Sequence, residues 1–258
     1  MILENLPIFL HRASNNGGFS GIKLIFSKAN QYIPITCTDE ITITYISGGV
    51  KKTDTYSGLS STLVSIPCDA NTQVVITGAV EDIDLSMQAY LISAKIKNTA
   101  LTSLNCSNCP ALATLDLSTN TALTYLNCYN CPALATLDLS TNTALTSLDC
   151  YNCPALATLD LSTNTALTSL DCSSCPALAT LDLSTNTALT YLNCSNCPAL
   201  VSISYPATNE DVSTAIAGAI TDADAADGTV YTDSAAAYYS TIATAATTKG
   251  WTIEQIAA

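Results

Sequence analysis

Ten cysteines in the middle of the chain form five CxxC pairs, a spacing that binds zinc in other proteins. Eighteen residues separate the pair Cys106/Cys109 from the pair Cys128/Cys131, as in a zinc ribbon. Four thiolates at this spacing could hold one tetrahedral Zn²⁺ ion. Against zinc, five pairs cannot all combine two by two, and proline rather than a glycine-containing knuckle follows each second cysteine.

The cysteine pairs belong to a 22-residue repeat, and each copy divides into two halves of 11 residues with one skeleton. We number the places of a half from its first leucine. Places 6 and 9 are Cys106 and Cys109 in one half, but Leu117 and Asn120 in the other. This comparison favours cysteines as small buried apolar side chains over cysteines as zinc ligands. The five copies begin at Leu101, Leu123, Leu145, Leu167 and Leu189.

The N-terminus bears on the redox state of these thiols. Its first residues, MILENLPIFLHRASNN, lack a basic segment, and Glu4, Asn5 and Pro7 interrupt the apolar stretch. We therefore expect no signal peptide, and reduced thiols rather than a disulfide framework. Disulfides between rungs are geometrically possible, because rungs about 4.8 Å apart fall within the permitted Cα separation.

Both half-repeats match the pattern L-x-x-L-x-L/C-x-x-N/C-x-x-L, so the chain resembles leucine-rich repeat proteins of the bacterial and phage subclass with nested 11-residue halves. The resemblance covers about half of the chain and implies a leucine-rich-repeat solenoid. Neither half has room for a helix, so we expect a mainly β fold with two parallel sheets back to back. The expected ladders of the solenoid core are Cys106, Cys128, Cys150, Cys172 and Cys194, and Asn120, Asn142, Asn164 and Asn186.

The chain divides into four predicted segments. Residues 1–19 read as an N-terminal arm, and residues 20–79 as a β-sandwich-like domain of β-branched strands separated by turn residues. Residues 80–205 form the predicted solenoid, whose first rung is a degenerate capping rung. Residues 206–258 form a small α/β cap, with helices at 209–220 and 233–250 and strands at 228–232 and 251–255. This last segment resembles the C-terminal segment of leucine-rich repeat proteins encoded by tailed phages and gut bacteria.

Composition excludes several functions. The net charge is −13, and residues 98–248 contain twelve acidic and no basic residues, so we expect no nucleic-acid partner. No apolar run is long enough to span a membrane. The one histidine, His11, lies in the arm, and neither a P-loop nor a GxGxxG motif is present. We therefore expect a protein that is not an enzyme and has no catalytic residues, no cofactor and no metal.

The two faces of the predicted solenoid differ. One face repeats Thr-x-Asp-x-Ser without change, while the other varies among tyrosine, serine, asparagine and aspartate. Outward tyrosines beside asparagine and aspartate suit recognition of protein or sugar, although drift after recent duplication explains the variation as well. The candidate binding face consists of Tyr125, Asn127, Tyr129, Asp149, Tyr151, Asp171 and Tyr191.

Together the two resemblances imply a structural and adhesive protein in the virion of a tailed phage, as a fibre, spike or decoration subunit assembled in the host cytoplasm. The N-terminal domain would bind other virion proteins, and the solenoid would meet a host-surface protein or glycan. Because such proteins are often trimeric, a homotrimer is the expected assembly. The alternative is a bacterial cell-surface or secreted leucine-rich-repeat adhesin. Ice binding is disfavoured, because aspartate and not threonine stands beside each threonine column.

Overall fold

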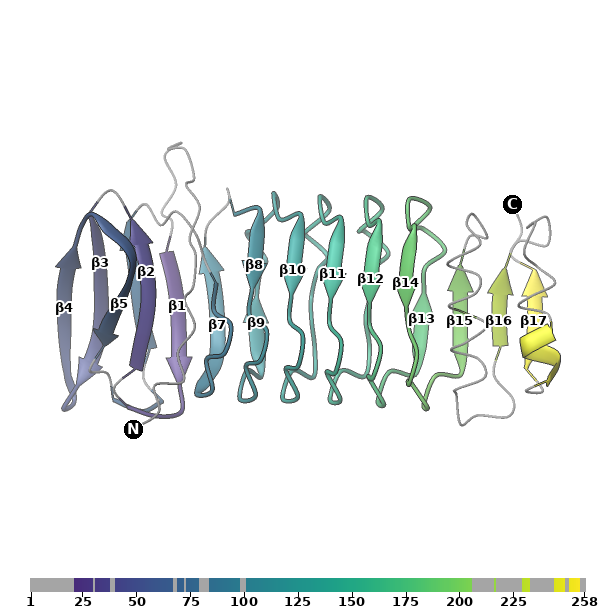
Figure 1. Ribbon diagram of the computed structural model, residues 1–258, viewed down its shortest axis with the longest axis horizontal. Coiled ribbons are helices and arrows are strands. Elements are labelled where there is room, and N and C mark those ends of the chain that lie inside the picture. The colour runs from purple at the N-terminus through teal and green to yellow at the C-terminus, as the bar shows by residue number, and fades with distance from the viewer. Residues whose placement is uncertain are drawn as a thin grey trace.

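The computed structural model describes residues 21–29, 31–37, 40–66, 69–71, 73–78, 84–97, 101–205, 216, 229–232, 244–248 and 251–255. These residues form an elongated row of strands stacked along the long axis of the molecule (Figure 1). The described part of the chain holds seventeen strands, and only Ile216 and residues 244–248 in it are helical. The predicted mainly β fold is therefore confirmed.

Two antiparallel sheets lie at the N-terminal end. Along β3, Ile41, Ile43 and Tyr45 are buried while their neighbours are half-buried, as alternation in a one-sided sheet requires. Ile66 of the second sheet belongs to the same buried cluster as these residues. The larger sheet contains β1 (Gly21–Phe26), β3 (Ile41–Ser47), β4 (Val50–Tyr56) and β6 (Gln73–Gly78), and the smaller contains β2 (Gln31–Cys37) and β5 (Leu59–Ile66).

The larger N-terminal sheet continues into the solenoid without a break. Strand β7 (Leu91–Lys97) pairs antiparallel with β1 and parallel with β9 (Thr114–Asp116). Leu91, Ala94 and Ile96 fill the buried places 1, 4 and 6 of a capping rung. Val80 and Ile83, the start of that predicted rung, lie outside the described residues, and the domain boundaries stay predictions.

The cysteine-bearing halves form the first sheet of the solenoid. Each strand covers places 3 to 5, and neighbouring strands pair in parallel register, so that Tyr125 lies beside Ser147 and Asn127 beside Asp149. The central residue of each strand is buried and its two neighbours face outward. The five strands are β8 (Ser103–Asn105), β10 (Tyr125–Asn127), β11 (Ser147–Asp149), β12 (Ser169–Asp171) and β14 (Tyr191–Asn193).

The second sheet is hydrogen-bonded near its two ends only. At one end β9 pairs with β7; at the other, four strands pair in parallel, while residues 136–138 and 158–160 between them form no strand pairing. The predicted solenoid with parallel sheets is present, and its second sheet is interrupted at residues 136–138 and 158–160. Its C-terminal strands are β13 (Thr180–Asp182), β15 (Ser202–Tyr205), β16 (Thr229–Thr232) and β17 (Thr252–Gln255).

The two halves close their turns differently. In the second sheet, the place-9 amide bonds back within its own turn, as in Asn142 N to Leu139 O at 3.0 Å. In the first sheet, place-6 and place-8 amides bond to the following rung, as in Cys128 N to Asp149 O and Asn130 N to Tyr151 O, both at 2.8 Å. Backbone bonds therefore join consecutive rungs throughout the first sheet.

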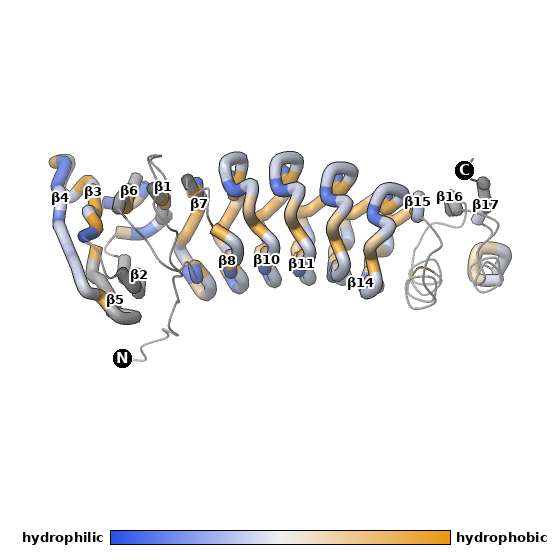
Figure 2. Tube along the Cα trace, turned by 90° about the horizontal axis from the view of Figure 1, so that it is seen from above, coloured by the Kyte–Doolittle hydropathy of each residue, from blue (hydrophilic) through white to orange (hydrophobic). Residues whose placement is uncertain are grey.

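Leucines and cysteines fill the space between the two sheets. The repeat leucines are 7% exposed or less, and Leu104, Leu126 and Leu170 are fully buried. Viewed from above, hydrophobic segments run through the middle of the solenoid and polar turns lie along its edges (Figure 2). The fold is a parallel-sheet solenoid of about five 22-residue turns, as the repeat predicts.

The C-terminal strands β16 and β17 lie where the sequence predicts strands and extend the second sheet by two parallel rungs. Residues 244–248, inside the predicted helix 233–250, are helical, as is Ile216 inside the predicted helix 209–220. The rest of both predicted helices, and the arm 1–19, lie outside the described residues.

Candidate binding face

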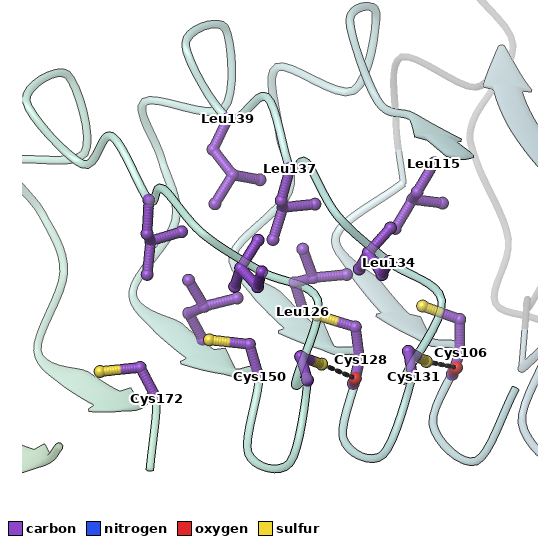
Figure 3. Close-up of a cluster of buried hydrophobic side chains, with 14 of the residues drawn as sticks. Cys106, Leu115, Leu126, Cys128, Cys131, Leu134, Leu137, Leu139, Cys150 and Cys172 are labelled. Atoms are coloured by element: carbon purple, nitrogen blue, oxygen red, sulfur yellow. Dashed lines mark hydrogen bonds between the residues drawn. The ribbon is translucent and has the colours of Figure 1, made fainter. Parts of the chain in front are cut away.

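Both cysteine columns lie in the solenoid core. All ten side chains are free thiols with at most 1% of their surface exposed. Figure 3 shows the place-6 residues Cys106, Cys128, Cys150 and Cys172 in one row beside the core leucines. Burial raises the pKa of the Cys106 and Cys172 thiols well above the ordinary value, so these side chains are neutral S–H groups.

Each place-9 cysteine donates its S–H to the place-6 carbonyl of the preceding rung. Cys131 Sγ lies 3.2 Å from Cys106 O, and the next rung repeats this contact (Figure 3). In the other half, Asn142 Nδ2 donates to the equivalent carbonyl, Leu117 O, at 3.2 Å and also to Asn120 O at 2.8 Å. Cysteine and asparagine at place 9 therefore make the same contact between rungs.

The asparagine column contains buried amide oxygens that accept no hydrogen bond from the described residues. These oxygens are fully buried and have no hydrogen-bond partner within the described chain. A buried polar atom without a partner lowers stability. These atoms include the Oδ1 atoms of Asn142, Asn164 and Asn186.

Place 8 of the cysteine-bearing half has a left-handed backbone in every rung. The φ angle is 55° at all five residues, a conformation that asparagine tolerates better than other non-glycine residues. Asn130 Nδ2 also donates to Asn108 Oδ1 at 2.9 Å, and Asn152 repeats this contact at 2.8 Å. The sequence analysis missed this column, whose signal is an asparagine that recurs at place 8 in this half only. Its members are Asn108, Asn130, Asn152, Ser174 and Asn196.

Asparagine and aspartate at place 5 hold the turn that follows each strand. Asn127 Oδ1 accepts the N–H of Tyr129 at 2.9 Å, and Asp149 Oδ1 accepts that of Tyr151 at 3.0 Å. One oxygen of each candidate binding residue at place 5 is thus committed to the fold. Only the remaining side-chain atoms are available to a partner.

The tyrosines of the candidate binding face lie on the first sheet. Tyr125 and Tyr191, at place 3, are 38% and 51% exposed. Tyr129 and Tyr151, at place 7 of neighbouring rungs, are half-buried and stack with ring centroids 5.2 Å apart and planes 13° apart. Place 7 lies beyond the strand and is less exposed than strict alternation predicts, since Ser173 at this place is buried.

Two carboxylates lie side by side on this face. Asp149 and Asp171 are register partners on β11 and β12, and both are half-buried. Burial, followed by the adjacent Asp171, raises the pKa of Asp149. Asp171 has partners for both oxygens, with Ser173 on Oδ1 and Asn193 Nδ2 on Oδ2 at 3.0 Å. The Oδ2 atom of Asp149 has no hydrogen-bond partner among the described residues.

The aspartates of the opposite face have different surroundings. Lys95, on the capping rung, pairs with Asp116 and, together with Ser118, lowers the pKa of Asp116 to about 2. Hydrogen bonds from Ser140 and Ser162 lower the pKa of Asp138 and Asp160. The sequence did not predict the ion pair of Lys95, because Lys95 lies in a degenerate rung. It precedes Asp116 by 21 residues, whereas the repeat has a period of 22.

Within the described residues, no three histidine, cysteine or carboxylate side chains are arranged to hold a metal ion. No helix in that part of the chain is long and apolar enough to cross a membrane.

No protein-family model and no curated protein matches the chain. Among solved structures, the functional domain of InlJ from Listeria monocytogenes, which includes a cysteine ladder, is 29% identical over 53% of this chain. The match covers 34% of that chain, with a TM-score of 0.35. The chain thus spans about a third of that structure's length.

Proposed function

We propose that this protein is a non-enzymatic structural and adhesive component of a tailed-phage virion, which binds a host-surface protein or glycan through the candidate binding face. The observation that carries the binding role is the exposure of large aromatic side chains at places where sister rungs have serine. Tyr125 and Tyr191 are among the few exposed large hydrophobic side chains of the described chain, and neither fills the core. Clustered aromatics dominate the energetics of many interfaces.

The particular setting follows from the sequence resemblances. The N-terminal β-domain binds other virion proteins, and the solenoid projects as part of a fibre, spike or decoration subunit, assembled as a homotrimer in the host cytoplasm. Detection of the protein in purified particles by mass spectrometry, and of trimers by native mass spectrometry, tests this setting. Absence from particles would favour the second candidate, a bacterial cell-surface or secreted adhesin, to which the nested leucine-rich pattern also points.

The binding role is tested by replacing Tyr125, Tyr129 and Tyr151 together with serine. Sister rungs carry serine at the equivalent places, so the variant should fold, as circular dichroism can check. We expect attachment to host cells to be lost, because aromatic anchors contribute about 2 kcal/mol or more each. The matched control replaces the threonines of the opposite face, Thr114, Thr136 and Thr158, by serine and should attach normally. Normal attachment of the tyrosine variant would instead make the solenoid a spacer.

A further inference from the structure

We propose that the candidate binding face recognises a basic protein partner by receiving a lysine or arginine side chain between Asp149 and the stacked rings of Tyr129 and Tyr151. This inference rests on the proposed binding role of the face and specifies the chemistry of its partner.

The geometry brings a carboxylate and aromatic rings together. Asp149 is two residues before Tyr151 on the same rung, and its register partner Asn127 is two residues before Tyr129 on the neighbouring rung. The stacked rings therefore border the column that contains Asp149. Aromatic faces attract cations within about 6 Å, and a carboxylate beside them adds a charged acceptor.

The charge balance of the face also calls for a cation. Asp149 and Asp171 lie side by side on neighbouring strands, where like charges repel. Residues 98–248 contain no lysine or arginine, so no basic side chain from that long segment can neutralise the pair. Asp171 is satisfied by Ser173 and Asn193, whereas Asp149 Oδ2 has no partner among the described residues.

On the opposite face, place 5 holds an ion pair between an aspartate and a cation. At place 5 of the second sheet, the chain supplies its own cation, and Lys95 pairs with Asp116 on the next strand. At place 5 of the first sheet, that cation is not provided by the described chain. A lysine or arginine from a partner would complete the equivalent arrangement.

The open sheet favours a protein over a free amine as the source of the cation. Asp149 and the two stacked tyrosines are half-exposed, so a small cation bound there stays hydrated and gains little. A partner that also covers the exposed Tyr125 would exclude water from the ion pair, and the pair would become stronger. A neutral glycan could stack on the same rings but would leave the carboxylates unneutralised.

The test uses a synthetic peptide with four arginines separated by glycine and serine, and a matched peptide with citrulline, which has nearly the same shape but no charge. Each is titrated into the full chain, and the ring signals of ¹³C-labelled tyrosine report binding at this face. We expect the arginine peptide to bind about tenfold more tightly than the citrulline peptide. Asp149→Asn should reduce arginine-peptide affinity about fivefold. Its turn is retained, since sister rungs carry asparagine here.

The control is Asp160→Asn, which removes a carboxylate from the opposite face and should leave the titration unchanged. Equal binding of the two peptides, or an unchanged affinity in Asp149→Asn, would overturn the proposal. Shifts of the same tyrosine signals by neutral cellohexaose, but not by the arginine peptide, would also overturn it and identify a glycan site. Those outcomes leave the binding role intact, because only normal attachment of the tyrosine-to-serine variant removes it.

Discussion

Ser174 has a backbone conformation that serine adopts at a cost. Its φ is 55°, and the four equivalent residues are asparagines. Asparagine tolerates this region better, and it would also extend the side-chain column that ends at Asn152. We expect Ser174→Asn to raise the free energy of unfolding by up to about 1 kcal/mol in urea denaturation. Asn152→Ser should lower it by a similar amount. An unchanged midpoint in both variants would show that place 8 is not under strain.

Asp149 should lower stability at neutral pH. Its pKa is raised in the folded chain, so its charge opposes folding above that pKa, and the penalty disappears as pH falls toward the unfolded value. We expect Asp149→Asn to stabilise the protein by a few tenths of a kcal/mol at pH 7, after allowance for solvent screening, and to have no effect near about pH 3. Unfolding curves at the two pH values check the difference. Destabilisation at pH 7 would mean that the asparagine does not replace the turn contact.

Asp116 should show the opposite dependence. Lys95 holds its pKa at about 2, so the ion pair adds stability above the unfolded pKa that is lost as pH falls toward 2. Because the pair is partly exposed, Lys95→Met should cost only about 0.5 kcal/mol at pH 7 and nothing near about pH 2. NMR titration of Asp116 should show its pKa rising in the variant. A pKa that stays near 2 would assign the shift to Ser118.

The protonation state of the core thiols determines whether they can bind zinc. Zinc binds thiolates, whereas Cys106 and Cys172 have raised pKa values and the place-9 thiols donate to carbonyls. We expect elemental analysis of the purified protein to find no stoichiometric zinc. Two or more zinc ions per chain would contradict the core arrangement of the cysteines.

At the scale of the element, place 9 tests whether the two halves are interchangeable. Asn142→Ala removes two hydrogen bonds, and we expect a loss of about 2 kcal/mol. Asn142→Cys retains a donor to Leu117 O, as Cys131 does for Cys106 O, and removes the buried oxygen that has no partner. It should therefore cost less than about 1 kcal/mol in the same denaturation experiment. Equal costs for the two variants would mean that the cysteine thiol contributes nothing as a donor.

The 11-residue comparison predicted the solenoid and its two-sided leucine core, because the periodicity of leucine decides which side chains are buried. It did not predict the interrupted middle of the second sheet, since both halves have equally good strand patterns. The stacking of Tyr129 on Tyr151 also needed the register between rungs. The candidate binding face remains a prediction, because exposure alone does not identify a partner.

At the scale of the whole molecule, stability should be a sum over neighbouring rungs. Deletion of residues 145–166 joins Ala144 to Leu167 within an unchanged repeat, so we expect a folded solenoid one rung shorter, with a lower free energy of unfolding. Circular dichroism and denaturation measure this. Thiol titration after unfolding without reductant should give twelve in the parent and ten in the variant, which lacks Cys150 and Cys153. An unfolded deletion variant would show that the rungs are not independent units.

The one-sided hydrogen bonding of the solenoid also determines how it deforms under force. Backbone bonds join every rung of the first sheet, but residues 136–138 and 158–160 lack such bonds on the other side. A load applied across the rod therefore separates the rungs on the second side first, while the hydrogen-bonded first sheet resists extension. The rod therefore curls toward its tyrosines, so that tension makes this face concave.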